Sequence, residues 1–202
     1  LSHISIGKHL EAYRSDLKKG DTQGAYHCAD QYLAVPEVRV SDDLTTMNHQ
    51  VIRALLHRWF EFFFLMVFWY MVADIAGILL AWFSLQYARA THCDAQGWRY
   101  LHWIEWIPVR LLGLTYALAG DFLRAFPVLH SYLWDRTTHS ADVLYRVANE
   151  SLAGQSVTMS CPVDESAEEA AAELDRWQRL HIRSLSVWMV IIGAATVGGY
   201  LL

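Results

Sequence analysis

The sequence has few of the features from which soluble catalytic or nucleic-acid-binding sites are recognised. Its three cysteines, Cys28, Cys93 and Cys161, are far apart and form no CxxC pair, so neither a disulfide framework nor a zinc finger is indicated. There is no Gly-rich phosphate loop and no GxSxG turn. The net charge is −5 without a basic run, so nucleic-acid binding has no electrostatic support. No cofactor is indicated.

Metal-ligating residue types occur side by side at His27-Cys28 and at His92-Cys93-Asp94. A metal site needs three or four ligands that converge, and the spacing offers no second cluster. We therefore interpret these residues as polar loop positions. The sequence predicts no metal site, and it contains no clear nucleophile–base pair that would predict a catalytic residue.

Apolar residues, in contrast, are abundant, at 54% of the 202 residues. Residues 60–83 are longer than the about 20 apolar residues that cross a bilayer core, and aromatic side chains crowd both ends, as in interfacial belts. Residues 184–202 carry no charge, and their glycines permit close helix packing. Both segments are predicted to span a membrane.

Residues 98–119 are ambiguous because charged residues and Pro108 interrupt an apolar stretch. The pattern fits a tilted span, a re-entrant segment or a helix that lies in the membrane interface. Arginines precede both 60–83 and 184–202, which puts both flanks on the cytoplasmic side under the positive-inside rule. That arrangement favours a return through the membrane by 98–119.

The predicted fold class is an all-α integral membrane protein, a polytopic helical bundle with amphipathic cytoplasmic helices. Residues 1–58 form a cytoplasmic helical hairpin, because apolar side chains recur there at helical spacing. Residues 59–120 form the membrane region, residues 121–183 a cytoplasmic helical loop, and residues 184–202 the C-terminal transmembrane helix. The stretch 165–183 is predicted to be a solvated helix. The chain begins without Met, and we expect further spans before Leu1.

Charged side chains within the apolar segments are the candidate binding residues. Asp74 lies near the middle of 60–83, where a carboxylate costs several kcal/mol, roughly, unless it is paired or faces a polar cavity. It is either a ligand or proton site, or the partner of Arg110 or His102. The full candidate set is Asp74, Glu61, Arg110, Arg58, Glu105 and His102.

Two other candidates have equally simple alternatives. Glu61 either binds a ligand or pairs with Arg58, three residues earlier on the same helix. Arg110 either binds a phosphate or carboxylate group, or extends its charge to the interface from a helix that is kinked at Pro108.

Residues 101–120, read as LHWIEWIPVRLLGLTYALAG, resemble a signature of the AmpE family, membrane proteins encoded beside the AmpD amidase in proteobacteria. The motif residues are Trp106, Pro108, Val109 and Arg110. The Phe68-Trp69 pair and the Gly20-Asp21 break are similar to other segments of that family, and the resemblance covers nearly the whole chain. It implies extra spans before this region.

The resemblance implies a multi-pass protein of the bacterial inner membrane. Its expected role is regulation or sensing in β-lactamase induction and cell-wall recycling, without enzyme activity. The expected partners are the lipid bilayer and either another membrane protein, which the bundle would dock, or a small cell-wall-derived ligand.

The AmpE family is in turn similar to CobD/CbiB, the membrane amide synthases of cobalamin biosynthesis (adenosylcobinamide-phosphate synthase type). Their P-A-R-L segment matches residues 108–111, but their E-N-x-x-D segment falls on His57, Arg58 and Glu61, where only the last acid is kept. ATP-driven amide formation needs acids that hold Mg²⁺. No catalytic residue is therefore carried over, and such a synthase is the alternative to a regulatory function.

Overall fold

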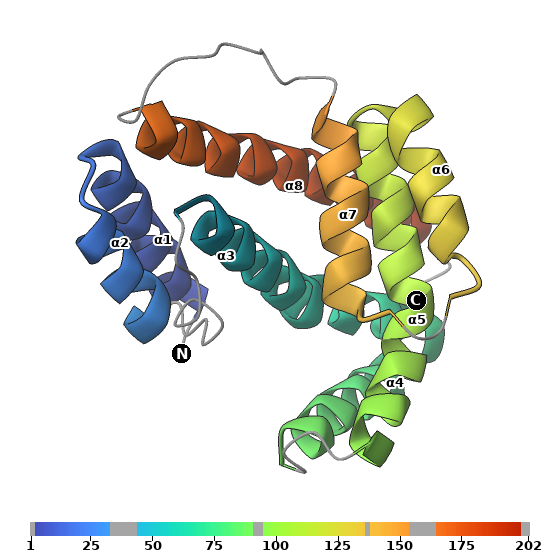
Figure 1. Cartoon of the computed structure of the whole chain (residues 1–202). Helices are drawn as coiled ribbons and strands as arrows, with labels where there is room; N and C mark the ends of the chain where they lie inside the picture. Colours follow the sequence, from blue (N-terminus) through green and yellow to red (C-terminus); the bar gives the residue numbers. More distant parts are fainter. Residues whose placement is uncertain (1–2, 33–43, 91–94, 136–137, 154–164, 199–202) are drawn as a thin grey trace. The chain divides into compact units, whose positions relative to one another are not determined.

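The computed structural model describes residues 3–32, 44–90, 95–135, 138–153 and 165–198, and every regular element within them is helical, as predicted (Figure 1). The chain forms two compact units. The first comprises Leu1–Leu55 and Gln155–Arg179, and the second comprises Leu56–Gly154 and Leu180–Leu202. Two helices, α3 (Leu44–Trp59) and α8 (Glu165–Val197), contribute residues to both units.

The first unit contains α1 (His3–Lys18), α2 (Thr22–His27), the π-helical turn η1 (Cys28–Tyr32) and the beginnings of α3 and α8. The chain turns after α1 at Gly20, whose φ of 72° favours glycine. Asp21 then caps α2 by accepting a hydrogen bond from the Gly24 amide at 2.8 Å. The periodic apolar positions predicted for this region are buried, including Leu10, Tyr13, Leu17, Met47, Val51 and Leu55.

The beginning of α8 packs into the first unit and is not a solvated helix, so that part of the prediction for 165–183 is wrong. Ala170, Leu174 and Trp177 are buried at helical spacing. The buried Asn48 of α3 donates its side-chain amide to Glu173 of α8 at 2.9 Å, and its side-chain oxygen accepts from Tyr13 at 3.3 Å. In the sequence, many charged residues lie between these apolar positions, so the composition of the segment is that of a solvent-exposed helix.

The second unit contains the end of α3, the π-helical turn η3 (Phe60–Phe64), α4 (Leu65–Ala90), α5 (Ala95–Ala119), α6 (Phe122–Tyr132), α7 (Ser140–Ala153) and the end of α8. Helix α5 contacts α4, α6 and α7. The core between these helices is apolar and includes Phe60, Phe64, Leu65, Val109, Leu112, Ala117, Leu129, Val143, Leu144 and Val147.

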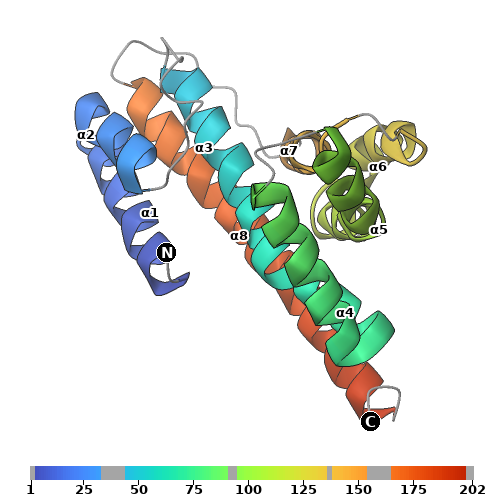
Figure 2. The same ribbon diagram turned by 90° about the horizontal axis from the view of Figure 1, so that it is seen from below.

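Helix α4 reverses its direction at Ala73 and Asp74 (Figure 2). Asp74 has φ 55° and ψ −143°, which no continuous helix contains. The part of α4 before Ala73 is its first limb, and the part after Asp74 is its second limb. A hydrogen bond of 3.2 Å from Arg89, in the second limb, to Glu61 shows that the second limb runs back along the first. In a straight helix these residues would lie about 42 Å apart. The two limbs approach so closely that a Cβ on Gly77 would lie 1.9 Å from the Trp69 carbonyl oxygen.

The reversal of α4 changes the interpretation of the predicted span 60–83, but it does not bear on the spans predicted for 98–119 and 184–202. Among the described residues, one helical stretch, Leu44–Ala90, is long and apolar enough to cross a membrane, and 17% of its most apolar window is buried. Length and composition alone also admit the core helix of a soluble protein. Because the stretch reverses at Asp74, residues 60–83 do not form one straight helix. The spans proposed for 98–119 and 184–202 stay predictions.

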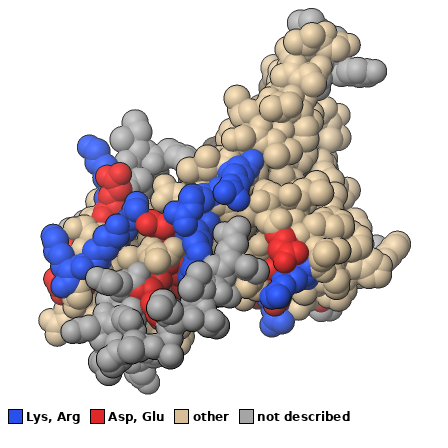
Figure 3. Space-filling view, turned by 90° about the horizontal axis from the view of Figure 1, so that it is seen from above, with Lys and Arg blue, Asp and Glu red and all other residues tan. Residues whose placement is uncertain are grey.

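Large apolar side chains are exposed on α4 and on the last part of α8. A broad area of the face in Figure 3 has no Lys, Arg, Asp or Glu side chain. The exposed apolar residues of these two helices include Val72, Ile75, Leu79, Trp82, Phe83, Met189, Val190 and Val197. An apolar surface of this kind is uncommon on a soluble monomer and typical of a surface that contacts lipid or another protein.

Candidate functional site

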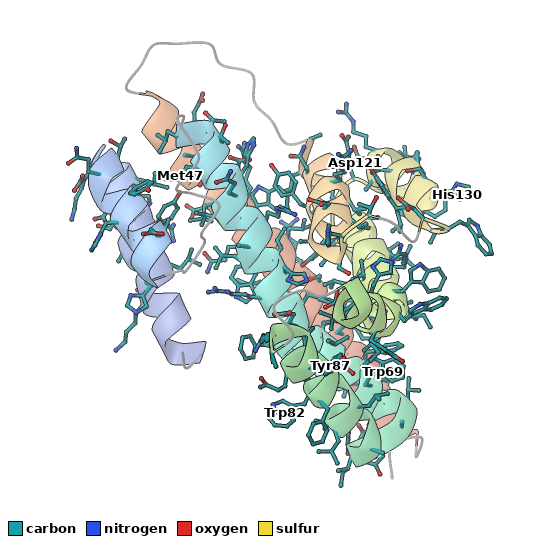
Figure 4. The ribbon with its side chains drawn as sticks, turned by 60° about the horizontal axis from the view of Figure 1, so that its bottom comes forward. Met47, Trp69, Trp82, Tyr87, Asp121 and His130 are labelled. Carbon is teal, nitrogen blue, oxygen red and sulfur yellow. The ribbon has the colours of Figure 1, made fainter. Side chains whose placement is uncertain are left out.

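Pro108 leaves a backbone carbonyl of α5 without its helical donor, and a tryptophan of α4 supplies another. Proline has no N–H, so the Ile104 carbonyl, four residues earlier, loses its usual hydrogen bond. The Trp69 indole N–H donates to this oxygen at 3.2 Å. Trp69 lies on the first limb of α4, whereas Trp82 and Tyr87 lie on the second (Figure 4). Two segments singled out in the sequence therefore meet in one hydrogen bond.

Arg110 holds the end of α6 against α5. Its guanidinium donates to the carbonyls of Trp106, at 3.2 Å, and of Tyr132, at 3.0 Å, and also to that of Asp135. The guanidinium carbon lies 5.0 Å from the centre of the Trp106 ring, a cation–π contact. The residue is 6% exposed, so most of its bonding capacity serves the fold.

A histidine and two acids converge beside α5. His57 Nε2 lies 3.8 Å from Glu105 Oε2, and His57 Nδ1 lies 3.9 Å from Glu61 Oε1. Arg89 donates to the other oxygen of Glu61 at 3.2 Å. Glu61 lies in η3, and π-helical turns are frequent at functional sites. Among the described residues, His57, Glu61 and Glu105 form the group whose ligand atoms lie close enough to hold one metal ion.

In the described part of the chain, several buried side-chain nitrogen and oxygen atoms of α5 have no hydrogen-bond partner. They include His102 Nε2, Glu105 Oε1 and Arg110 Nε. Buried polar atoms are nearly always bonded, because an unpaired one loses its hydration without replacement. Such atoms on one helix indicate that a ligand, ion or ordered water bonds there.

The other predicted candidates lie elsewhere. Asp74 is exposed at the reversal of α4, and among the described residues it makes no ion pair. The alternative in which Asp74 pairs with Arg110 is not found, because Arg110 donates to the carbonyls named above. Arg58 is half-buried on α3. The structure thus brings together Glu61 and Glu105 and leaves Asp74 apart.

Sequence reasoning missed His57 and Arg89 as members of the cluster. A charge in an apolar segment requires a partner, and Glu105 was such a signal, but the identity of the partner depends on the reversal of α4. In the His27-Cys28 pair, Cys28 is buried, and its thiol donates a hydrogen bond to the His9 carbonyl at 3.2 Å. His92-Cys93-Asp94 lies outside the described residues.

Comparison with known proteins identifies the family. The profile of "Regulatory signalling modulator protein AmpE" matches residues 2–196. The chain belongs to the AmpE family. It is 30% identical over 164 residues to Protein AmpE of Shigella flexneri, a match that covers 74% of this chain and 58% of that protein. The chain thus spans less than two thirds of the AmpE relative that it matches, and no solved structure matches it.

Proposed function

We propose that this AmpE-family chain is part of a multi-pass inner-membrane regulator that modulates β-lactamase induction in response to cell-wall recycling, without catalysing a reaction itself. Membership of a family of regulatory signalling modulators supports the regulatory role. The exposed apolar side chains of α4 and of the last part of α8 support a membrane location.

The unpartnered polar atoms of α5 are the observation that carries this proposal. His102 Nε2 and Glu105 Oε1 are buried without a hydrogen bond, on a helix that contacts α4, α6 and α7. Such atoms gain most from a ligand that supplies the missing donors and acceptors. We propose that a small, polar, cell-wall-derived molecule or a segment of a membrane partner bonds them and thereby biases the regulator.

The experiment measures β-lactamase activity after exposure to an inducing β-lactam. The bacterial host has an inducible β-lactamase and lacks its own AmpE-family gene, which is replaced by the full-length gene of this protein. Glu105→Gln keeps nearly the same size and alters the bonding group, whereas His102→Asn shortens the side chain and removes the Nε2 position. We expect both to reduce induction at unchanged protein levels in the membrane fraction.

The matched control is His130→Gln, because His130 is exposed on α6 of the same unit (Figure 4). This variant should support wild-type induction. If Glu105→Gln and His102→Asn also support wild-type induction, α5 has no part in the signal and the proposal fails. Arg110→Ala is less informative, because that substitution removes the bonds that hold the end of α6.

A further inference from the structure

The geometry around His57 suggests a second kind of ligand, one that goes beyond the proposed regulatory function. One nitrogen or oxygen atom from each of His57, Glu61 and Glu105 lies within 4.8 Å of the other two. Ligand atoms that share one Zn²⁺ ion, at bonds of about 2.0–2.2 Å, lie about 3–3.5 Å apart. The three side chains would therefore need to move inward by only about 1 Å, which a change of side-chain torsion supplies.

Glu105 gives an independent reason to expect a cation. The residue is 2% exposed, and its Oε1 atom is buried without a hydrogen-bond partner. Its other oxygen faces His57 Nε2 at 3.8 Å, which is too long for a hydrogen bond. A carboxylate that has lost its water needs a compensating charge or donor. A metal ion at the centre of the three side chains would supply that charge.

Arg89 is compatible with a cation at this position. Its guanidinium bonds Oε2 of Glu61 at 3.2 Å, while Oε1 of the same carboxylate faces His57. Metal-ligating carboxylates are commonly held by a second hydrogen bond of this kind, which fixes their orientation. The arginine therefore leaves one oxygen of Glu61 for the ion.

We propose that His57, Glu61 and Glu105 bind one divalent transition-metal cation. The donor set of one imidazole nitrogen and two carboxylates suits Zn²⁺, Mn²⁺ or Fe²⁺ better than Mg²⁺ or Ca²⁺, which prefer oxygen ligands alone. Three protein ligands leave a coordination position for water or for an oxygen atom of a bound molecule.

The test titrates the purified full-length protein, free of any affinity tag and in detergent, with Zn²⁺ alone in a calorimeter. A weak chelator is present to suppress adventitious binding. We expect one equivalent to bind, and Glu105→Gln and His57→Gln each to weaken the affinity by at least about 10-fold. Zinc content after desalting, measured by atomic absorption, should fall in the same variants.

The matched control is His49→Gln. His49 and Glu173 form a histidine–carboxylate pair at 3.5 Å in the first unit, but they belong to no group of three ligands among the described residues. This variant should bind Zn²⁺ as the wild type does. Because Glu105 is buried, circular dichroism and size-exclusion chromatography check its variant, and Glu61→Gln provides a second, more accessible substitution.

Two results would overturn the proposal. One is the absence of stoichiometric Zn²⁺ in the wild-type protein. The other is an unchanged affinity in folded Glu105→Gln and Glu61→Gln variants. Either result leaves the regulatory function standing, because that function is measured by β-lactamase induction.

Discussion

The indole of Trp69 donates a hydrogen bond to the carbonyl of Ile104 at 3.2 Å. This carbonyl is the one that Pro108 leaves without a helical donor. The proline therefore leaves an acceptor on α5 without its helical donor, and the Trp69 indole of α4 donates to it. The bond links the Phe68-Trp69 segment to the Pro108-Val109-Arg110 motif.

Replacing Trp69 by Phe should destabilise the protein in a way that depends on Pro108. Trp69→Phe keeps an aromatic ring but leaves the Ile104 carbonyl without a donor, so the free energy of unfolding should fall by about 1–3 kcal/mol. In a Pro108→Ala background the restored backbone N–H bonds the carbonyl, and Trp69→Phe should cost less. Chemical unfolding of the four proteins in detergent measures this coupling. Strictly additive losses would show that the bond does not contribute.

The reversal of α4 predicts a short distance between two exposed positions. Spin labels at Phe62 and Tyr87, which are 48% and 49% exposed, would lie about 38 Å apart on a straight helix. Packed helical limbs have axes about 8–10 Å apart, so pulsed electron paramagnetic resonance should give a label separation below about 25 Å. Labels at Phe62 and Leu79 provide a second pair across the same reversal. A separation near 38 Å would contradict the hairpin.

The helices of this protein are predictable from sequence where an apolar stripe alternates with polar residues. The periodic positions Leu10, Tyr13 and Leu17 fall on one buried face of α1, and the segment predicted to be helical over 121–183 contains α6 and α7. In these segments the hydrophobic period itself determines which face is buried.

The reversal at Asp74 was not predictable in the same way. Apart from Glu61 and Asp74, residues 60–83 are predominantly apolar on every face of a helix, so no hydrophobic period indicates a change of direction. The reversal occurs at Ala73-Asp74, without the Gly or Pro that usually marks a turn. Gly77 lies three residues after the reversal, at the point where the second limb of α4 contacts the Trp69 carbonyl.

The candidate site was predictable in part. Glu61, Glu105 and Arg110 were recognised because a charged residue in an apolar helix must find a partner. The partners themselves depend on how α4 folds back, so Arg89 and His57 were missed. The ligand or interfacial role of Arg110 stays a prediction: one terminal nitrogen of its guanidinium donates to the carbonyls of Tyr132 and Asp135, and its buried Nε has no hydrogen-bond partner among the described residues.

Gly120, just after α5, lies so close to the backbone of α7 that a methyl group at this position should disrupt the packing. A Cβ at Gly120 would lie 2.5 Å from the Ser151 carbonyl oxygen, which also accepts the Asp121 amide at 2.9 Å. Because the obstacle is backbone, Gly120→Ala should lower the free energy of unfolding by about 1–3 kcal/mol. Thermal unfolding in detergent measures the change. An unaltered midpoint would mean that α5 and α7 separate at this point without cost.

Gly193 provides the control for that measurement. It lies within α8, and a Cβ there would meet no atom within 4 Å. Gly193→Ala should leave the protein as stable as the wild type or stabilise it by up to about 1 kcal/mol, since alanine favours the helix. The contrast between the two variants separates steric conflict from helix propensity.

The burial of His181 predicts that stability depends on pH in the acidic range. His181 stacks on Trp59, with ring centres 4.4 Å apart, and bonds the Tyr116 hydroxyl at 3.1 Å. Burial lowers the pKa of His181 from 6.5 to about 4. Between these values the unfolded chain binds a proton that the folded chain does not, so stability is intact above pH 6.5 and falls as the pH is lowered toward 4. The full loss from this group is about 3 kcal/mol.

His181→Gln tests the assignment, because glutamine keeps a hydrogen-bonding group but does not titrate. Chemical unfolding of both proteins in detergent at several pH values between 7 and 4 isolates the contribution of this one side chain from that of the other histidines. The wild type should lose more stability than the variant over this range. Equal slopes for the two proteins would mean that His181 is protonated in the folded chain as readily as in the unfolded chain, and that its environment between Trp59 and Tyr116 is hydrated.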